Sequence, residues 1–410
     1  MKLPAISLFS GCGGMDYGFE AAGFHTSVAL EMDSVCCNTL RENRSWPVME
    51  EDIFDVTPQH IMATAGIKPR QAALMIGGPP CQPFSKSGYW SKGDTARLND
   101  PRANTLKAYL KVLEAAQPQV FVLENVSGLA FDGKNEGLDF LLTEIVSVNR
   151  RTGCRYIPEW RILKAADYGV PQLRERLFLV AARNGQPFEF PEPTFRALAP
   201  AEWMNDRPTY RSCWDALGDI THDEHGDDLA MRGKWAALLP SIPEGSNYLW
   251  HTERGGGEPL FGWRRRYWNF LLKLAKNLPS WTIQAQPGPS TGPFHWHNRR
   301  LSRRELCRLQ TFPDDVSITG NYLEAHRQIG NAVPSLLAEV IGRELMKQFF
   351  GAPILNYPTL LPPKRENCPE PEAIKRVPAK YRMLRNTETE HPGTGHGPGA
   401  IARNHALSVA

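Results

Sequence analysis

The segment AISLFSGCGG, Ala5 to Gly14, decides the fold because an apolar run leads directly into a glycine-rich turn. The apolar residues 5–9 predict a buried strand, and the following residues, through about Ala22, predict a helix. Glycines in such a turn let the backbone bend sharply and let a ligand approach the start of the helix. We therefore interpret this segment as the first unit of an α/β fold that binds a ligand at one edge of its sheet.

Further apolar runs repeat this pattern along the first 190 residues. They are VALEM (28–32), ALMIGG (73–78), VFVLENV (120–126) and LFLVAA (177–182). Continuous apolar runs are typical of strands that are covered on both faces. Helical patterns, such as those at residues 35–42 and 104–117, separate several of these runs. The alternation predicts an α/β class, Rossmann-like doubly wound sheet.

The composition changes after residue 190. Residues 191–325 are rich in proline, glycine and tryptophan and show little periodicity, which predicts a smaller, loop-rich second domain. Periodicity returns in residues 333–350, which predict an amphipathic helix starting at Pro334. The Pro-rich residues 352–410 predict a disordered tail.

The overall composition is that of an ordinary soluble protein, with 41% hydrophobic and 22% charged residues. No apolar run approaches the roughly 20 residues that span a bilayer, and the start of the chain lacks the features of a signal peptide. We therefore expect an intracellular protein with no membrane partner. The eight cysteines are scattered without a CxxC pair, and His295 and His297 lack partners at ligand spacing, so we expect no metal site.

Basic residues are concentrated in one stretch, although the net charge is only +3. Between Arg254 and Arg308 there are eleven Lys or Arg residues against two acidic residues. Aromatic residues are interleaved with them: Phe261, Trp263, Tyr267, Trp268, Phe270, Trp281, Phe294 and Trp296. This mixture suits phosphate contacts combined with base stacking, and a solvated basic face is the alternative.

Two carboxylates are predicted at the same sheet edge as the glycine turn. Glu31 ends the second strand, where it can accept hydrogen bonds from ribose hydroxyls, and Asp52 is expected to end the third. The turn reads GCGGMDYG and lacks the GxGxxG of dinucleotide binders. A second carboxylate also suits an adenine amino group better than a pyrophosphate. These residues favour S-adenosylmethionine over a nicotinamide dinucleotide, and tight strand-to-helix packing is the alternative without a ligand.

The loop GGPPCQPFS (77–85) mounts a single cysteine, Cys81, behind two prolines that stiffen the chain. Cysteine is a strong nucleophile at neutral pH and attacks as its thiolate. Glu124 ends the strand VFVLE at the same edge, and Arg174 and Arg176 begin another strand. A glutamate can donate a proton to a ring nitrogen, and an arginine can hold that glutamate and a ring carbonyl. A helix cap and a surface ion pair are the alternatives for these residues taken singly.

Six motifs occur in this order: FSGCGGMDYGFE, GGPPCQPFS, LENV, QLRERLFLV, RRLSRRELCRLQTFP and QIGNAVP. Together they resemble the DNA (cytosine-5)-methyltransferase family over roughly residues 3–345. The resemblance implies a large catalytic domain that binds S-adenosylmethionine, formed by residues 1–190 and completed by residues 326–350. It also implies that residues 191–325 form a target-recognition domain.

The resemblance implies a role for each matching residue. Cys81 would add to C6 of cytosine, Glu124 would contact N3 and the exocyclic amine, and Arg176 would hold the base carbonyl and Glu124. Arg174 is the fourth predicted catalytic residue. The family extrudes the target base from the duplex before this chemistry. The positions that match cofactor contacts are Phe9, Gly11, Gly13, Glu31, Met32, Asp52, Ile53 and Asn331. One departure is Ser7, where many members of the family have an aspartate.

The predicted function is therefore methylation of C5 of cytosine in a short duplex DNA sequence. We expect a monomer in the bacterial cytoplasm that belongs to a restriction-modification system, with a cognate endonuclease acting separately. A tRNA cytosine-5 methyltransferase is one alternative, and the long second domain argues against it. A catalytically silent DNA-binding protein is the other, and the presence of Cys81, Glu124 and both arginines argues against that.

Overall fold

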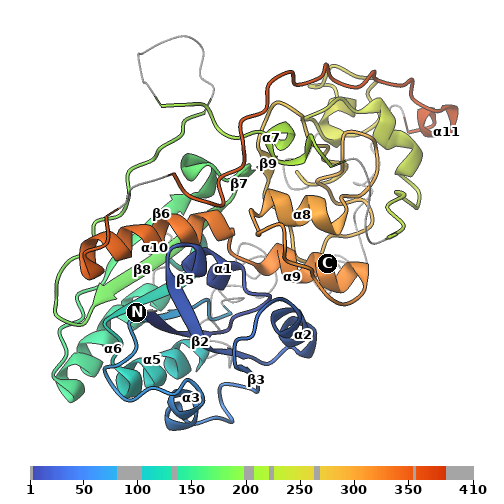
Figure 1. Cartoon of the computed structure of the whole chain (residues 1–410). Helices are drawn as coiled ribbons and strands as arrows, with labels where there is room; N and C mark the ends of the chain where they lie inside the picture. The colour runs from blue at the N-terminus through green and yellow to red at the C-terminus, as the bar shows by residue number, and fades with distance from the viewer. Residues whose placement is uncertain are drawn as a thin grey trace, which may run out of the picture.

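The computed structural model describes residues 3–80, 104–130, 136–197, 207–220, 226–262, 268–353 and 357–384. Its main feature is a seven-stranded sheet with the order β3-β2-β1-β4-β5-β8-β6 (Figure 1). The strands are β1 (Leu3–Leu8), β2 (Phe24–Glu31), β3 (Val48–Glu50), β4 (Leu74–Gly77), β5 (Val120–Val126), β6 (Glu159–Lys164) and β8 (Glu175–Ala182). The sheet confirms the predicted α/β class.

The sheet is parallel except for β8, which pairs antiparallel with both β5 and β6. The chain moves outward from β1 through β2 to β3, and then returns to β4 on the other side of β1. The carboxyl ends of β1 and β4 therefore flank the point where the strand order reverses. Open α/β sheets bind their ligands at this point.

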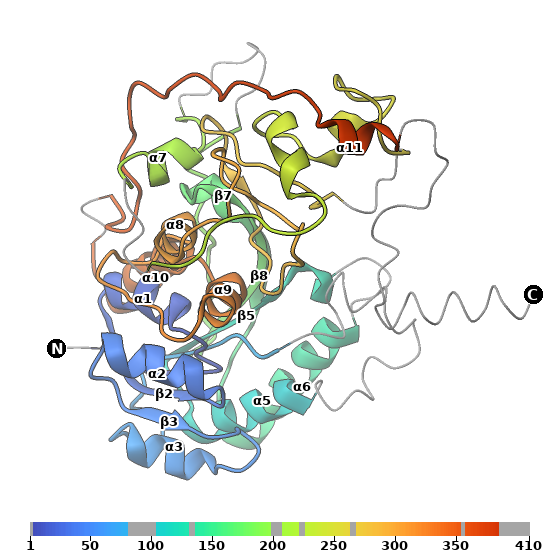
Figure 2. The ribbon, with the colours of Figure 1, turned by 90° about the vertical axis from the view of Figure 1, so that its right-hand side faces the viewer.

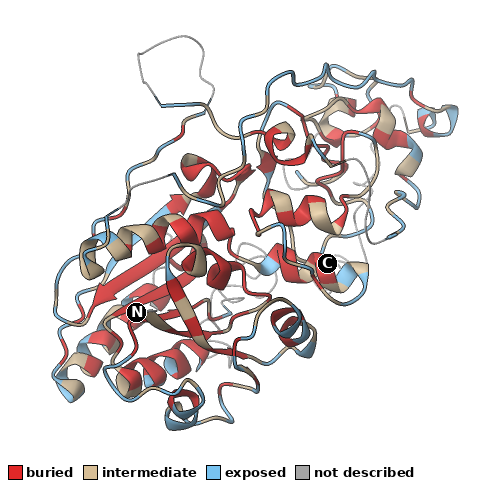
Figure 3. Cartoon of the chain, in the orientation of Figure 1, coloured by how far each residue is buried: buried red, intermediate tan, exposed pale blue. Residues whose placement is uncertain are grey.

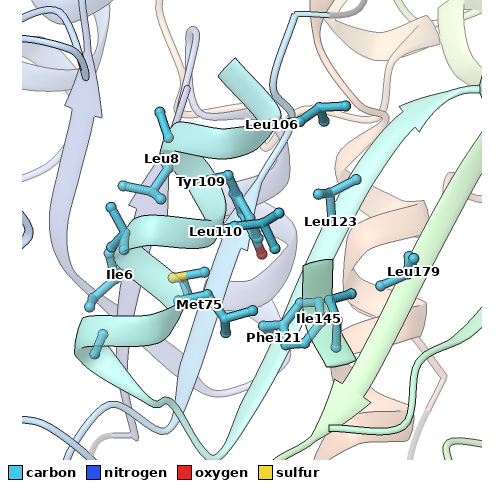
Figure 4. Packing of buried hydrophobic residues seen from close by; sticks show 14 of the residues in the cluster. Ile6, Leu8, Met75, Leu106, Tyr109, Leu110, Phe121, Leu123, Ile145 and Leu179 are labelled. Carbon is cyan, nitrogen blue, oxygen red and sulfur yellow. The ribbon is translucent and has the colours of Figure 1, made fainter. Parts of the chain in front are cut away.

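Helices cover both faces of the sheet, which explains why the strand sequences are apolar throughout. One face carries α3 (Pro58–Thr64), α5 (Asn104–Ala116) and α6 (Glu136–Thr152). Figure 4 shows Ile6 and Leu8 of β1 and Leu123 of β5 in the apolar cluster on this face. The other face carries α1 (Gly14–Ala21) and α10 (Ser335–Phe350), and α2 (Ser34–Asn43) follows β2.

The predicted helix near Pro334 is α10, and it packs directly on α1. A Cβ atom added to Gly18 of α1 would lie 2.2 Å from the Ser335 carbonyl oxygen, so the two helices touch through their backbones. Phe19 and Leu336 pack in the same apolar cluster as the strands. The last long helix of the chain thereby becomes part of the unit that contains the sheet, which we call the sheet unit (residues 3–197 with α10).

The second unit (residues 207–331) has little regular structure, as its Pro- and Gly-rich sequence predicts. Its elements are α7 (Cys213–Leu217), η5 (Ala236–Ser241), η6 (Tyr248–His251), β9 (Ser280–Trp281), α8 (Arg303–Leu309) and α9 (Tyr322–Asn331). It has an apolar cluster of its own around Trp235 and Tyr248 (Figure 3). The strand β9 pairs with β7 (Gln172–Leu173), so the two units meet next to the start of β8.

The remaining elements are short. The 3-10 helices η3 (Ser127–Ala130) and η4 (Ala165–Tyr168) follow β5 and β6, and α11 (Ala379–Arg382) lies near the end of the described chain. The third strand ends at Glu50, so Asp52 lies in the turn after the strand and not at its end as predicted.

The prediction of a disordered tail is wrong for residues 357–384. This segment leaves the end of α10, runs over the second unit and ends at α11 (Figures 1 and 2). Val377 and Tyr381 are buried in the apolar cluster of the second unit. Its prolines prevent regular secondary structure, but they do not prevent docking onto a folded surface. Residues 385–410 of the predicted tail lie outside the described part of the chain.

Candidate functional site

Among the described residues, Glu31, Glu124 and Arg176 lie at one edge of the sheet. The carboxyl ends of β1, β2, β4 and β5 lie at this edge because these strands are parallel. The antiparallel β8 starts at the same edge, where its residue Arg176 pairs with Val126 at the end of β5. This reversal brings Arg176 next to Glu124, although 51 residues of chain separate them.

Glu124 and Arg176 form a buried ion pair. The Arg176 Nε atom lies 2.8 Å from Glu124 Oε1, and the two side chains are 14% and 11% exposed. Burial raises the pKa of the Glu124 carboxyl, while the positive charges of Arg176 and Arg174 act in the opposite direction. Glu124 therefore retains a proton more readily than an exposed glutamate, which suits a group that protonates a ring nitrogen.

The loop that leads to Cys81 is held against β5. A Cβ atom on Gly78 would lie 2.9 Å from Glu124 Oε2, so a side chain at this position would displace the carboxylate. Asn125 Nδ2 donates to the Pro79 carbonyl at 3.2 Å, and Thr105 Oγ1 donates to the Pro80 carbonyl at 3.3 Å. Cys81 itself lies outside the described residues.

Arg174 has different partners from Arg176. Its guanidinium donates to the carbonyl oxygens of Ile283 at 3.3 Å, Gly330 at 2.9 Å and Asn331 at 3.4 Å. Burial, together with the nearby positive charge of Arg176, lowers the pKa of Arg174. The last two carbonyls belong to the C-terminal end of α9, where a cation is favourable. We therefore interpret Arg174 as a positioning residue that ties β8 to α9 and to the segment after β9.

Glu31 is fixed at the end of β2 by three backbone donors. Its Oε2 accepts from the Gly11 N–H at 2.8 Å, and its Oε1 accepts from Met32 and Asp33 at 2.9 Å each. Burial raises the pKa of Glu31, and these three hydrogen bonds act against that increase. A carboxylate has about four acceptor positions, so Oε2 retains capacity for one more donor, such as a ribose hydroxyl.

The glycine turn leaves space next to this carboxylate. Phe9 and Gly11 both have φ near 55°, in the left-handed region, which is rare for a phenylalanine and common at ligand sites. Gly13 has φ 84°, also in the left-handed region. A Cβ atom on Gly11 would meet no atom within 4 Å. The apolar side chain of Met32 is 67% exposed beside Glu31.

The other predicted cofactor residues differ in their surroundings. Asp52 uses Oδ1 to accept from the Phe54 N–H at 3.1 Å, and Phe54 is 54% exposed. The side chain of Ile53 is buried in the apolar core, where it stabilises the fold. Asn331 is exposed at the end of α9, two residues before Val333, whose carbonyl lies against Gly14. The structure therefore places Asn331 near the glycine turn.

Sequence reasoning missed a contact that supports the loop after Glu31. Asp33 caps α2 by accepting from the Val35 N–H at 3.0 Å, and it also pairs with Arg327 of α9. The hydrogen bond from Arg327 lowers the pKa of Asp33. An aspartate directly before a helical pattern is a cap signal in the sequence, but the identity of its partner depends on tertiary structure.

A buried carboxyl lies beside Ser7, the residue that departs from the family pattern. Asp16 of α1 is fully buried and accepts from Thr26 Oγ1 at 3.2 Å. Burial raises its pKa to about 6, against the effect of hydrogen bonds from Ser7 and Thr26. In this chain the buried carboxyl next to residue 7 thus comes from Asp16 of α1, and not from residue 7 of β1 itself.

Replacing Asp16 with asparagine should change how stability depends on pH. The folded pKa of about 6 lies above the unfolded value of 3.8, so wild-type stability falls as the pH rises through this interval. The asparagine amide does not ionise, so the variant does not lose this free energy of unfolding, which is on the order of 3 kcal/mol. Melting temperatures should show an advantage of Asp16→Asn over the wild type that grows from pH 4.5 to 7. An advantage that does not vary with pH would contradict the assignment.

The basic stretch 254–308 is not a uniform surface, and several of its cations are used internally. Lys273 is buried and donates to the Ile242 carbonyl, and burial lowers its pKa to about 8. The other internally paired cations are Lys276 with Glu244, Arg299 with Glu305, Arg303 with Asp227 and Arg308 with Asp314. These five residues are therefore poor candidates for phosphate contacts. Residues 263–267, which include Arg264, Arg265 and Arg266, lie outside the described ranges.

The aromatic residues of this stretch also fall into two groups, one buried inside the fold and one exposed. Phe294 and Trp296 are buried, and Phe261 and Phe270 pack against the apolar cluster of the second unit. Trp268 and Trp281 are instead 41% and 37% exposed, and their rings meet edge to face at 5.2 Å. Trp281 of β9 pairs with Leu173 of β7. Leu173 lies three residues before Arg176 in the chain. This exposed pair therefore lies close to the start of β8.

The described residues meet neither the requirements of a metal site nor those of a membrane-spanning helix. No group of three or more His, Cys, Asp or Glu residues among them is arranged to hold a metal ion. No helix in the described ranges is long and apolar enough to span a membrane.

Comparisons with known proteins find relatives over most of the chain. The family model described as C-5 cytosine-specific DNA methylase matches residues 3–347. The Type II methyltransferase M.SacI of Streptomyces achromogenes is 38% identical over 372 residues, which cover 85% of this chain and 93% of that protein. The Type II methyltransferase M.AquIA of Picosynechococcus sp. is 46% identical over 239 residues, which cover 57% of this chain and 94% of that protein.

Solved structures share the fold at low sequence identity. The crystal structure of a Spodoptera frugiperda DNMT2 mutant superposes with a TM-score of 0.56 at 16% identity. The match covers 84% of this chain and 99% of the other. At this identity the likeness establishes a common fold and nothing about the substrate.

Proposed function

The chain belongs to the C-5 cytosine-specific DNA methylase family and is a DNA cytosine-5 methyltransferase, and from this premise we propose that it modifies one short duplex sequence through Cys81. The observation that carries the proposal is the buried Glu124–Arg176 pair beside Gly78, at the start of the loop that continues into Cys81. Glu124 thus supplies a proton donor and Arg176 a cation beside Gly78, three residues before the proposed nucleophile in the sequence.

The proposed chemistry assigns one task to each group. The Cys81 thiolate adds to C6 of cytosine while Glu124 gives a proton to N3, which makes C5 nucleophilic. Arg176 holds Glu124 and the base carbonyl oxygen. After C5 is methylated, its proton passes to water and the thiolate is eliminated, which restores the aromatic ring. N3 then returns its proton to Glu124. The base must leave the duplex stack for these atoms to meet.

The family depends on S-adenosylmethionine, and the residues around Glu31 fit that molecule. Glu31 has acceptor capacity for a ribose hydroxyl, the exposed Met32 offers an apolar surface to adenine, and the backbone at Gly11 leaves open space. S-adenosylmethionine supplies an electrophilic methyl group when bound. Phe9, Gly13, Asp52 and Asn331 complete the proposed binding surface.

Replacing Glu31 with glutamine should weaken binding of S-adenosylmethionine by about tenfold to a hundredfold, because a charged acceptor is lost. Calorimetric titration without DNA measures this directly, so the result is independent of turnover. The matched control is Glu51→Gln, since Glu51 is exposed. Equal affinities of the two variants would remove Glu31 from the cofactor site.

Duplex DNA is the proposed substrate, and the second unit is proposed to read it. The exposed Trp268 and Trp281 supply aromatic surface near β8, and Arg264, Arg265 and Arg266 are the proposed phosphate contacts in the adjoining segment. The relatives are named as Type II methyltransferases, which supports a role in a restriction-modification system. We propose a monomer in the bacterial cytoplasm whose cognate endonuclease is a separate chain.

The test is transfer of a radiolabelled methyl group from S-adenosylmethionine to duplex DNA of mixed sequence, with tRNA assayed in parallel. Label recovered as 5-methylcytosine in DNA, confined to one sequence context, is the expected result. Label in tRNA alone would overturn the proposed substrate but keep the chemistry. Label in neither would favour a catalytically silent DNA-binding protein.

A further inference from the structure

The segment 357–384, which we call the C-terminal strap, crosses from the sheet unit to the far side of the second unit (Figures 1 and 2). It lies beyond residue 347, where the family match ends, and none of the functions assigned above uses it. Its contacts are unusual because it meets buried charged side chains at three separate places.

The first contact is on α10 of the sheet unit. Glu339 is completely buried, and its Oε1 accepts from the Thr359 N–H at 2.6 Å and from Thr359 Oγ1 at 3.1 Å. Its Oε2 accepts from the Leu360 N–H at 2.9 Å. Glu339 also lies 3.5 Å from Arg343 of its own helix. A buried carboxylate is costly unless it is hydrogen-bonded, and the start of the strap supplies these three hydrogen bonds.

The second contact is on α7 of the second unit. Asp215 is completely buried, and it accepts from the Arg365 N–H at 2.8 Å and from Lys364 Nζ at 3.1 Å. Arg365 also donates Nε to the Asp215 carbonyl at 3.0 Å and pairs with Asp219 at 2.7 Å. The strap therefore attaches to the middle of this short helix and to Asp219, two residues beyond its end.

The third contact is deeper in the second unit. The side chain of Lys276 is 4% exposed and lies 2.6 Å from Glu244 Oε1 and 3.1 Å from Glu372 Oε1. The Glu372 N–H donates to Glu244 at 2.8 Å, and the Glu370 carbonyl accepts from Lys276 at 3.1 Å. Lys276 is thus paired from both sides, by the second unit and by the strap.

The end of the strap is anchored by an aromatic stack. Tyr381 is 3% exposed and lies on Trp235 with ring centroids 5.7 Å apart and an interplanar angle of 18°. Its hydroxyl donates to the Lys234 carbonyl at 2.6 Å, and Val377 is buried beside it. The strap therefore reaches the apolar cluster that organises the second unit.

We propose that the C-terminal strap is a brace that fixes the orientation of the second unit relative to the sheet unit, and so sets the affinity of the enzyme for DNA. The two units share an apolar cluster that contains Tyr17 and Leu40 of the sheet unit and Leu306 and Ile329 of the second unit. The part of the second unit around Trp235 belongs to a separate cluster, and this is the part that the strap holds. The strap adds a further connection through noncovalent contacts, with one end held by Glu339 on α10 and the other by Trp235.

Correct spacing between the two units matters most for a duplex that must contact both of them. The proposed S-adenosylmethionine site lies on the sheet unit except for Asn331 of α9, which Arg174 and the Asp33–Arg327 pair hold independently of the strap.

The inference rests on the proposed duplex DNA substrate, and the test compares three variants of the full chain. Tyr381→Ala removes the anchor, Tyr381→Phe keeps the ring on Trp235, and Tyr357→Ala changes a strap residue that is 85% exposed. We expect Tyr381→Ala to raise the KM for duplex DNA by about tenfold, the equivalent of 1.4 kcal/mol. The affinity for S-adenosylmethionine should stay unchanged, and the other two variants should behave as the wild type. All assays are made well below every melting temperature.

Small-angle X-ray scattering tests the brace without any catalytic readout, so it separates failure of this inference from failure of the proposed substrate. A larger radius of gyration for Tyr381→Ala than for Tyr357→Ala is the expected result. If Tyr381→Ala is insoluble, Glu372→Gln replaces it, with the exposed Glu366→Gln as its control. A variant that loses thermal stability but keeps both the wild-type KM for DNA and the wild-type scattering profile would show that the strap only stabilises the fold.

Discussion

Replacing Cys81 with alanine will reduce methyl transfer by at least about a thousandfold, because no other group can form the bond to C6. Binding of S-adenosylmethionine and of duplex DNA should remain largely intact, since the change removes one sulfur atom from a loop that Asn125 and Thr105 hold at Pro79 and Pro80. Steady-state methylation assays and calorimetric titrations measure these quantities separately.

The matched control is Cys368→Ala, because Cys368 is an exposed cysteine on the strap. It should retain full activity. A second measurement uses duplex DNA that carries 5-fluorocytosine, in which no proton can leave C5, so that the covalent adduct accumulates. The wild type and Cys368→Ala should form this adduct, and Cys81→Ala should not. Residual turnover of Cys81→Ala above about a thousandth of wild type would rule out the nucleophile assignment.

Replacing Glu124 with glutamine should lower kcat by about 10²- to 10⁴-fold, the usual range for loss of a positioned proton donor. The amide keeps the shape of the carboxyl but has no acidic proton to give to N3. It also leaves Arg176 without its negative partner in a buried site. Affinity for S-adenosylmethionine, whose proposed site is at Glu31, should change little.

The pH dependence provides a second readout for Glu124. Burial raises its pKa, so a larger fraction is protonated near neutrality than for an exposed glutamate. A step that needs the protonated form slows as the pH rises through this pKa, and Glu124→Gln should lose that part of the profile. Glu175→Gln is the control, because Glu175 is exposed and is the neighbour of Arg176 at the start of β8. A profile unchanged in Glu124→Gln would contradict the proton-donor role.

Local sequence predicted the sheet edge well. The five apolar runs all became strands, and the ends of β2 and β5 place Glu31 and Glu124 where the sequence indicated. These predictions succeeded because strand identity and the parallel direction depend on short-range patterns. The direction of β8 had no such signal, since a buried apolar strand reads the same in either orientation.

The basic and aromatic stretch was less predictable. Its composition indicated a nucleic-acid surface, but Lys273, Lys276 and Trp296 are buried. Composition counts charges and rings without showing which of them pair internally. Trp268 and Trp281 differ from their neighbours only in their surroundings in the folded chain.

The sequence by itself determined the α/β class, the glycine turn, the carboxylates at the strand ends and the family, because each depends on residues that are close together in the chain. Only the tertiary structure decided that Arg174 binds α9, and that a Pro-rich tail is a docked strap. These outcomes depend on contacts between segments that can lie more than a hundred residues apart. Such pairings are selected by burial and charge satisfaction in the whole fold, which no local pattern encodes.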